Sequence, residues 1–370
     1  MKKRLLLLGG GHAHLETIAA IHTLKKRGHE ILVVSPSRYH YYSGMGPGML
    51  GGTYTPEEIR FDVASMVSRQ GATFIEEKAK SIDASKREVV LQSGESLSYD
   101  VLSINVGSCV ADGIPQAKEA QIFPVKPIEK MLRLKETLTR KTRQKCLSIA
   151  IAGGGPSSAE VAGNIIQLVD RIGGHQPDIT IYSQARFLSR FSESIKIRVK
   201  EILENKGVHI VEKDAMVRIE PDAVVLKSGC NFPADIVVSA TGVRPSPVIE
   251  KSGLPTGPDH GLRVNRYLQC SDHPEIFGGG DCIYFEKRPL SKTGVYAVRQ
   301  NRPLLHNLTA SLEEKPLNAF HPGTPYLLVF NLGSGIGYFK KNGFTFDGKL
   351  AFQIKNYIDR RFMKRYQKLQ

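Results

Sequence analysis

Two short runs of apolar residues in this chain each end in three consecutive glycines. Residues 5–8 lead into the glycines of 9–11, and residues 148–152 lead into the glycines of 153–155. Apolar side chains then recur at helical spacing after each glycine triplet. A buried strand, a glycine turn and a helix in this order predict a βαβ unit. The pattern therefore predicts two such units in one chain.

A glycine turn between a strand and a helix suits the pyrophosphate of a dinucleotide. Glycine permits the tight turn and lets a phosphate approach free backbone N–H groups. In the first turn His14 takes the place of the third fingerprint glycine, so this motif alone is weak evidence. Its repetition indicates a protein that holds two dinucleotides.

Each unit is completed by a second buried strand that ends in serine, at Ser35 in the first and Ser183 in the second. Many dinucleotide-binding proteins place an acidic residue here, on the adenosine ribose. A serine hydroxyl can also bond to the ribose. Arg186 follows Ser183 and either accommodates a 2′-phosphate or is an ordinary solvated charge, so NADH and NADPH both stay open.

The order of elements after each unit is repeated as well. Predicted strands end at Gly107 and Gly242, and a later strand ends at Gly280-Asp281, where the aspartate alone would suggest only a turn cap. We predict an α/β fold with two Rossmann-like dinucleotide-binding domains and a small C-terminal β region with an amphipathic helix. The predicted domains are residues 1–118 with 246–321, residues 119–245, and residues 322–370.

Two segments of the first domain have less certain patterns. Residues 39–48 combine glycines with tyrosines, and they predict either a surface loop with core tyrosines or a backbone that passes close to a flat ring system. Residues 55–71 predict a helix, because Pro56 and two glutamates have the composition of a helix start.

The C-terminal region predicts antiparallel strands at residues 326–330 and 336–339, followed by a helix from about residue 350. Its predicted apolar face comprises Ile354, Ile358, Phe362, Tyr366 and Leu369, and the rest of the helix is strongly basic. Such a helix suits a membrane surface. Amphipathicity also fits packing on the protein's own core or on a second subunit, as in a homodimer.

Composition restricts the choice of partners. The 51 Lys and Arg residues exceed the 36 Asp and Glu residues and give a net charge of +15, which favours phosphate-bearing cofactors or anionic membranes. We expect no nucleic acid, because no nucleic-acid module accompanies the charge. The five cysteines are scattered without a C-x-x-C pair, so we expect reduced thiols and no metal site. No stretch reaches the length of a membrane span, and we expect a cytoplasmic protein.

Taken in order, these motifs resemble those of the FAD-dependent pyridine nucleotide-disulfide oxidoreductases, which have the glutathione reductase type of fold. Within that family the chain is similar to type II NADH dehydrogenases and sulfide:quinone oxidoreductases. It is most similar to a subgroup associated with selenophosphate synthetase, through residues 9–14, 42–48, 294–300 and 358–362. One departure is that Gly155, Pro156 and Ser157 are followed by no cysteine where sulfide:quinone oxidoreductases have one.

The resemblance implies a set of site residues. Glu160 would point towards the junction of nicotinamide and flavin, and Gln300 would lie near the flavin ring, so these two are the candidate catalytic residues. The implied FAD residues are Gly9, Gly11, His12, Ala13, His14, Ser35, Gly44, Gly107, Gly280, Asp281 and Gln300. The implied NAD(P)H residues are Gly153, Gly155, Pro156, Ser157, Glu160, Ser183, Arg186 and Gly242.

The implied activity is hydride transfer from NADH or NADPH to FAD, followed by electron transfer to a quinone or another small acceptor. Residues 350–370 would then contact the cytoplasmic face of a membrane peripherally. Two alternatives stay open: a soluble flavin reductase of a sulfur or selenium compound, and a flavin-bound sensor with little turnover.

Overall fold

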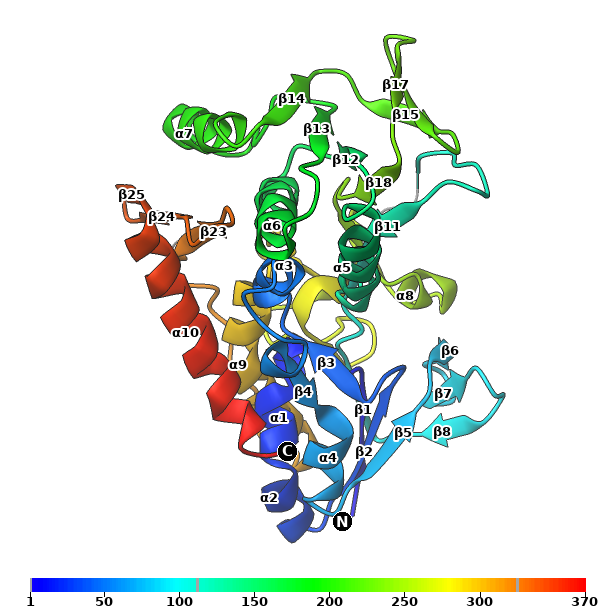
Figure 1. The fold of residues 1–370 in the computed structure, drawn as a ribbon. Coiled ribbons are helices and arrows are strands. Elements are labelled where there is room, and N and C mark those ends of the chain that lie inside the picture. The colour runs from blue at the N-terminus through cyan, green and yellow to red at the C-terminus, as the bar shows by residue number, and fades with distance from the viewer. Residues whose placement is uncertain (1, 111–112, 324–325) are drawn as a thin grey trace.

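The computed structural model describes residues 2–110, 113–323 and 326–370, and two parallel sheets lie one above the other at its centre (Figure 1). The first has the strand order β21-β9-β1-β2-β5 and the second β11-β18-β12-β13-β14. The strands of the first are β1 (Arg4–Leu8), β2 (Glu30–Ser35), β5 (Thr73–Glu76), β9 (Val101–Ile104) and β21 (Ile276–Gly278). Those of the second are β11 (Ile122–Pro124), β12 (Ser148–Ala152), β13 (Asp178–Ser183), β14 (Val208–Glu212) and β18 (Ile236–Ser239).

The two sheets are built alike, which confirms the predicted α/β fold with two Rossmann-like units. The strands that precede the glycine triplets, β1 and β12, hold the same central place and pair in parallel with both neighbours. Three antiparallel strands precede β9 of the first sheet, and three precede β18 of the second, which holds the matching place. They are β6 (Ala79–Asp83), β7 (Glu88–Leu91) and β8 (Ser96–Ser98) in the first half, and β15 (Met216–Ile219), β16 (Ala223–Leu226) and β17 (Asn231–Pro233) in the second.

Helices cover the sheets and connect their strands. The α-helices are α1 (Leu15–Ala19), α2 (Ile21–Lys26), α3 (Gly46–Leu50), α4 (Val63–Ser68), α5 (Glu129–Lys141), α6 (Pro156–Ile172), α7 (Glu193–Glu204), α8 (Val248–Lys251), α9 (Gly294–Leu312) and α10 (Lys349–Gln367). Short 3₁₀ turns are η1 (His12–His14), η2 (Ser43–Met45), η3 (Glu57–Ile59) and η4 (Gly280–Cys282). Short strand pairs are formed by β3 (Tyr39–Tyr41) with β4 (Arg60–Asp62), β10 (Ser108–Val110) with β19 (Val243–Pro245), and β20 (Leu262–Val264) with β22 (Ile283–Phe285).

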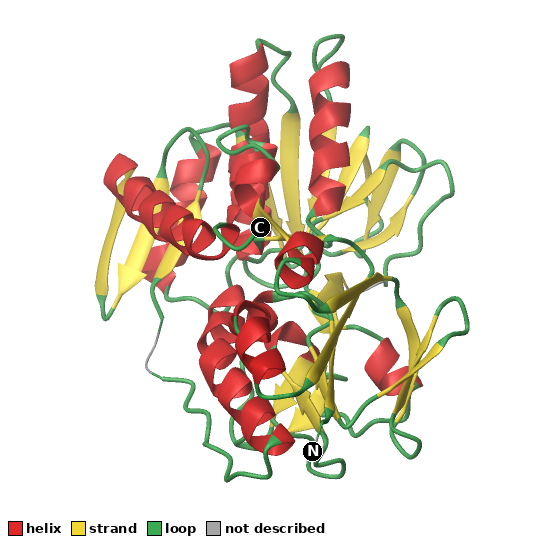
Figure 2. Ribbon diagram, turned by 90° about the horizontal axis from the view of Figure 1, so that it is seen from below, coloured by secondary structure: helices red, strands yellow, loops and turns green. Residues whose placement is uncertain are grey.

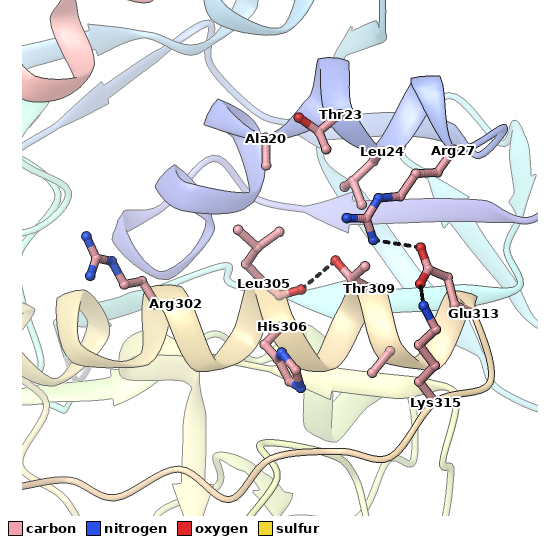
Figure 3. A pocket seen from close by; sticks show the side chains of 11 residues that line it. Ala20, Thr23, Leu24, Arg27, Arg302, Leu305, His306, Thr309, Glu313 and Lys315 are labelled. Carbon is pink, nitrogen blue, oxygen red and sulfur yellow. Dashed lines mark hydrogen bonds and ion pairs between the residues drawn. The ribbon is translucent and has the colours of Figure 1, made fainter.

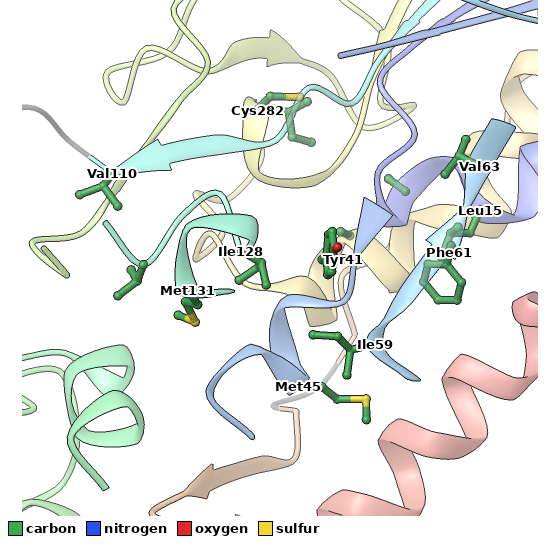
Figure 4. Packing of buried hydrophobic residues seen from close by; sticks show 14 of the residues in the cluster. Leu15, Tyr41, Met45, Ile59, Phe61, Val63, Val110, Ile128, Met131 and Cys282 are labelled. Carbon is green, nitrogen blue, oxygen red and sulfur yellow. The ribbon is translucent and has the colours of Figure 1, made fainter. Parts of the chain in front are cut away.

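The predicted helix over residues 55–71 is wrong in its first half. Residues 60–62 form strand β4, and Phe61 is fully buried between the half-buried Arg60 and Asp62, which is the alternation of a strand. The Asp62 side chain then accepts a hydrogen bond from the backbone N–H of Ser65 and caps α4. Figure 4 shows Ile59, Phe61 and Val63 in the apolar core beside this turn.

The segment after β3 is not the surface loop that was one of its two predicted forms. Residues 46–50 form the buried helix α3, which packs against α5 and α6. A Cβ added to Gly46 would lie 3.1 Å from Ile128, and one added to Gly48 would lie 2.5 Å from the Tyr54 ring. These glycines therefore serve close packing of the helix.

The predicted C-terminal strands are confirmed, with a third strand added: β23 (Leu328–Asn331), β24 (Gly337–Lys341) and β25 (Phe344–Gly348) form an antiparallel sheet. This sheet and α10 lie beside the two larger sheets (Figure 2). The predicted apolar face of α10 is divided in the structure. Tyr366 is buried against the first domain, whereas Ile358 is 42% exposed.

Candidate functional site

The two glycine turns have the same local geometry. Gly9 has a φ of +94° and Gly153 a φ of +119°, which only glycine adopts readily. A Cβ on Gly9 would lie 2.2 Å from the Asn105 carbonyl oxygen, and one on Gly153 would lie 2.3 Å from that of Ala240. Each turn therefore lies directly against the strand that follows its unit, and both positions require glycine for the same two reasons.

His14 explains how the first turn functions without its third glycine. Its ring is fully buried, with Nδ1 2.6 Å from the Gly9 carbonyl oxygen and Nε2 2.8 Å from Ser103 Oγ. Desolvation lowers the pKa of His14 to about 4, so the ring is neutral. Because both ring nitrogens bind the protein itself, the His14 side chain braces the turn from behind.

Asn105 lies between the first turn and the later Gly280 turn. A Cβ on Gly11 would come within 2.7 Å of Asn105 Nδ2, and one on Gly280 within 2.6 Å of its Oδ1. Asn105 Nδ2 is buried and has no hydrogen-bond partner within the described ranges. An unsatisfied buried amide beside bare glycine backbone fits a polar ligand such as FAD, in which the missing acceptor would be supplied.

Asp281 belongs to a small polar cluster with two residues that the sequence did not single out. Its Oδ2 accepts hydrogen bonds from Lys126 Nζ at 2.7 Å and from Ser108 Oγ at 2.8 Å, and Lys126 Nζ lies 3.0 Å from Ser108 Oγ. Lys126 follows β11 of the second sheet, so it carries a charge from one half of the protein to the aspartate of the other. Neither Lys126 nor Ser108 was among the predicted site residues.

Gln300 lies on α9 and is buried. Its Oε1 accepts a hydrogen bond from the backbone N–H of Gly280 at 2.7 Å. The side chain therefore fixes the glycine turn next to Asp281. Ala13 is also buried, and a Cβ on Gly279 would lie 2.7 Å from it, so η1 and η4 pack tightly.

Glu160 lies on the first turns of α6 and faces the C-terminal region. Its Oε1 accepts a hydrogen bond from the backbone N–H of Asn331 at 2.8 Å. Desolvation raises the pKa of Glu160 to about 7, against the opposing attraction of Lys355. A carboxyl group with this pKa can take up or release a proton near neutral pH.

A second cluster lies near Glu160; it includes the predicted residue Gly44, together with Tyr42, Lys355 and Asp359, which were not among the predicted site residues. Lys355 Nζ donates to Asp359 Oδ2 at 2.5 Å and to the Gly44 carbonyl oxygen at 2.7 Å, and Tyr42 Oη donates to Asp359 Oδ1 at 3.0 Å. Lys355 and Asp359 are spaced i, i+4 on α10, on the side that faces the protein. That spacing was the available signal, but the charges were assigned to the solvated face.

The remaining predicted residues lie at the edges of the second turn and the strand ends. Gly155 and Gly242 have open space around their Cα atoms, Pro156 begins α6, and Ser157 is exposed. Gly107 has open space around its Cα atom, as Gly155 and Gly242 do.

The serines that end the second strand of each unit are both buried. Ser183 lies beneath Gly154, and Ser35 is at the matching place in the first unit. Arg186 pairs with Glu193 at 3.1 Å. In register, Glu76 stands beside Ser35 and Glu212 beside Ser183.

The cysteines do not form a reactive pair. All five are free thiols. Cys282 is buried, its Sγ donates to the Gly279 carbonyl oxygen at 3.2 Å, and desolvation raises its pKa to about 11. A thiol with this pKa is a poor nucleophile. The described part of the chain also holds no group of three metal-binding side chains.

A separate groove lies between α2 and α9, away from both glycine turns (Figure 3). Leu24 and Leu305 line it, and at its rim Glu313 is paired with both Arg27 and Lys315. The charges of Arg27, Glu313 and Lys315 at this rim are therefore paired with one another.

The chain has two Rossmann-like units with the same order of strands, and they are in contact through the ion pair of Lys126 and Asp281. This arrangement is typical of oxidoreductases that bring two dinucleotides together. The chain belongs to the pyridine nucleotide-disulphide oxidoreductase family, whose model matches residues 3–303. It is 27% identical over 388 residues to the type II NADH:quinone oxidoreductase of Staphylococcus saprophyticus subsp. saprophyticus, covering 97% of this chain and 95% of that protein. It is 29% identical to ferroptosis suppressor protein 1 of Taeniopygia guttata, covering 77% of this chain and 75% of that protein.

Solved structures agree with this assignment of the fold. The sulfide:quinone oxidoreductase of Aquifex aeolicus superposes with a TM-score of 0.82 at 20% identity, covering 99% of this chain and 92% of that chain. NDH2 of Plasmodium falciparum, solved with NADH, superposes with a TM-score of 0.80 at 14% identity, covering 99% of both chains. Among the described residues, no helix combines the length and the apolar character that crossing a membrane requires.

Proposed function

We propose that this protein oxidises NADH or NADPH through bound FAD and passes the electrons to a quinone. The observation that carries the proposal is the repeated glycine turn, with Gly9 and Gly153 each packed on a strand-end carbonyl of its own domain. A protein with two such turns has a place for FAD and for a nicotinamide dinucleotide. FAD, when bound, would supply the redox chemistry, accepting a hydride and releasing two electrons.

The chain's own residues would bind and orient the two dinucleotides. In the first domain the bare backbone at Gly9, Gly11 and Gly280 would admit the pyrophosphate, and Asn105 and Asp281 would bind polar groups of FAD. In the second domain, Gly155 and the start of α6 would bind the pyrophosphate of NAD(P)H, because a helix of 17 residues has free N–H groups at its N-terminus.

Glu160 and Lys355 would handle protons on the side of the acceptor. Reduction of a quinone to a quinol consumes two protons, and Glu160 has a pKa of about 7 within a cluster that reaches α10. The attraction of Asp359 and Glu160 raises the pKa of Lys355, against its burial, so this ammonium group stays charged. A fixed positive charge here would stabilise negative charge that develops on the acceptor.

The outer face of α10 supports a membrane location for the acceptor. Leu350, Tyr357 and Ile358 are 60%, 65% and 42% exposed, and Phe344 at the start of β25 is 76% exposed. Basic side chains surround them, among which Arg361 and Lys364 are exposed. An exposed apolar and basic stripe suits the cytoplasmic face of an anionic membrane, and a second copy of the chain is the other candidate partner.

We also propose that the chain belongs to the subgroup of this family that is associated with selenophosphate synthetase. Residues 294–300 and 358–362 carry the motifs of the subgroup associated with selenophosphate synthetase. In the structure these segments begin α9 and form part of α10, beside the two clusters described above.

Steady-state assays test the proposal. Protein reconstituted with FAD should reduce a water-soluble quinone with NADH or NADPH, and the comparison of the two fixes the preferred donor. If the reconstituted protein consumes neither nucleotide in the presence of quinone, the proposed function is wrong.

A further inference from the structure

His12 follows the first glycine turn directly, and its ring is enclosed by the protein. The side chain is 8% exposed, and its Nδ1 lies 2.8 Å from Nε2 of His40 on β3. The two ring centroids are 4.5 Å apart, and the planes meet at 83°. The proposed activity does not yet use this histidine pair.

Aromatic side chains form the walls around the pair. Phe362 of α10 lies almost parallel to the His12 ring, with centroids 6.1 Å apart and an angle of 14°. Tyr42 approaches the same ring to 5.3 Å, and Phe61 stacks on His40 at 6.3 Å. The pair therefore lies where the FAD domain meets the helix that carries Lys355 and Asp359.

The hydrogen bonds of His12 are incomplete. One nitrogen of the pair must donate to the other, and desolvation keeps both rings neutral, with the pKa of His12 lowered to about 4. If His40 Nε2 donates, His12 accepts at Nδ1 and carries its own proton on Nε2. His12 Nε2 is buried and has no partner in the parts of the chain that the structure describes. A buried N–H without an acceptor fits a ligand that brings a carbonyl oxygen.

We infer that His12 Nε2 donates a hydrogen bond to a carbonyl of the quinone ring, and that His40 supplies the proton through His12. The inference rests on the proposed function. A neutral flat ring suits the walls formed by Phe362 and Tyr42. A phosphate suits them poorly, because the Asp359 carboxylate, which accepts a hydrogen bond from the Tyr42 hydroxyl, places a negative charge beside the same wall.

Both histidine rings stay neutral while a proton passes along the pair. FAD, when bound, would supply the two electrons. The quinone carbonyl oxygen then forms an O–H bond as the N–H bond at His12 Nε2 breaks. His12 Nδ1 takes the proton from His40 Nε2, and the half-buried His40 takes one from water at Nδ1. One proton thus enters the pair at His40, and one leaves it from His12 to the quinone oxygen. The second proton of the quinol comes by another route. His12 touches the substrate, whereas His40 is a positioning residue that acts through it.

Three variants of the holoenzyme separate the two roles. His12→Phe keeps an aromatic ring but removes the donor, His12→Gln keeps an N–H donor that cannot relay protons, and His40→Phe removes the proton supply. Stopped-flow reoxidation by a water-soluble quinone should slow at least tenfold in all three. Reoxidation by ferricyanide, which takes electrons without protons, should stay within twofold. Quinone binding, measured by quenching of flavin fluorescence, should weaken about tenfold in His12→Phe only.

A solvent isotope effect on quinone reduction should be present in the parent protein and should be at least as large in His40→Phe, because proton delivery limits the slowed reaction. His29→Phe is the matched control, because His29 is also a buried histidine of the FAD domain with an unpartnered ring nitrogen among the described residues. It should match the parent in every assay.

Several outcomes overturn the inference. Parent-like quinone rates and affinity in His12→Phe would exclude the contact. Loss of FAD from both His12 variants at an unchanged melting temperature would mean that Nε2 binds the flavin instead. An equal fall of the quinone and ferricyanide rates would mean a structural role. Failure of the parent itself to reduce any quinone would refute the proposed function, which is a different result.

Discussion

At the scale of single residues, burial sets the protonation of groups near the glycine turns. Glu160 has a pKa raised to about 7 from 4.5, and the main cause is desolvation. The unfolded chain releases this proton more easily than the folded protein does, so the group costs stability as pH rises from 4.5 through 7. The difference of about 2.5 pH units corresponds to a cost on the order of 3 kcal/mol at pH 8.

Glu160→Gln should therefore be more stable than the parent at pH 8 by up to this amount, and about equally stable at pH 4.5. Glutamine keeps an acceptor for the Asn331 N–H, and Asp359 keeps Lys355 paired. Urea unfolding at the two pH values measures the difference. A variant whose stability relative to the parent does not change with pH would show that Glu160 has an ordinary pKa.

His14 has the opposite dependence on pH. Its pKa is lowered to about 4 from 6.5, so the neutral ring is favoured in the folded protein and stability falls as pH drops from 6.5 towards 4. His14→Gly restores a glycine but removes the bond to Ser103 and leaves a cavity. We expect a loss of roughly 2–4 kcal/mol at pH 7 that becomes smaller at pH 4.5.

Chemical unfolding across this range checks the His14 prediction. His209→Gln is the control, because the His209 side chain is 71% exposed and its replacement should change stability by less than about 0.5 kcal/mol. A His14→Gly variant as stable as the parent at pH 7 would mean that the histidine does not brace the turn.

At the scale of elements, α6 holds the two domains and the C-terminal sheet together. A Cβ on Gly163 would lie 2.2 Å from the Leu332 carbonyl oxygen, so α6 touches the backbone after β23. On the same helix Asn164 donates to the Asn331 carbonyl oxygen, and Gln167 donates to the Gly51 carbonyl oxygen next to α3. These contacts explain why polar side chains are buried on this helix.

Gly163→Ala should destabilise the protein by about 1–3 kcal/mol, although alanine favours helices, because the added methyl group forces two backbones apart. Gly113→Ala is the control, since Gly113 has open space around it and should change stability by less than about 0.5 kcal/mol. Thermal unfolding of both variants measures this. A stabilised Gly163→Ala protein would contradict the described contact.

The exposed stripe of α10 gives a prediction about membranes. Serine at Leu350, Tyr357 and Ile358 together should abolish co-sedimentation with anionic vesicles and leave the melting temperature within about 2 °C, because these side chains are exposed. The control has serine at Val217 and Phe232, which are exposed but distant in sequence from α10, and it should bind as the parent does. Retained vesicle binding by the triple variant would exclude the stripe as the contact.

The sequence predicted most elements because their patterns are local. The strand, turn and helix around Gly9 and Gly153 follow from short-range patterns, and so does the repeat. What it missed depends on contacts between distant segments. Lys126 and Lys355 were not among the predicted site residues, and only the fold brings them to Asp281 and Asp359.

The differences between the predictions and the structure also arise from contacts between segments that are distant in sequence. His14 occupies a glycine position, and only its contact with Ser103 on β9 shows that the ring supports the turn from inside. Residues 60–62 lie in a stretch with a helical start, but pairing with β3 makes them a strand. The apolar face of α10 was predicted as one surface, whereas the structure buries Tyr366 and exposes Ile358.

At the scale of the whole molecule, two copies of one architecture face a shared region. Asn105 follows β9 and Asp281 follows β21 of the first sheet, and Lys126, which follows β11 of the second sheet, pairs with Asp281. The net charge of +15 adds an overall attraction for phosphate-bearing cofactors and anionic surfaces. The two glycine turns of this arrangement suit the two dinucleotides, NADH and FAD, that a type II NADH:quinone oxidoreductase-like activity requires.

An anaerobic titration of the purified protein tests the central claim most directly. The protein should be yellow, with the visible spectrum of bound FAD, and stoichiometric NADH or NADPH should bleach that spectrum before any acceptor is added. Added quinone should then restore it. A colourless protein that binds no added FAD, or a bound flavin that neither nucleotide bleaches, would contradict the account.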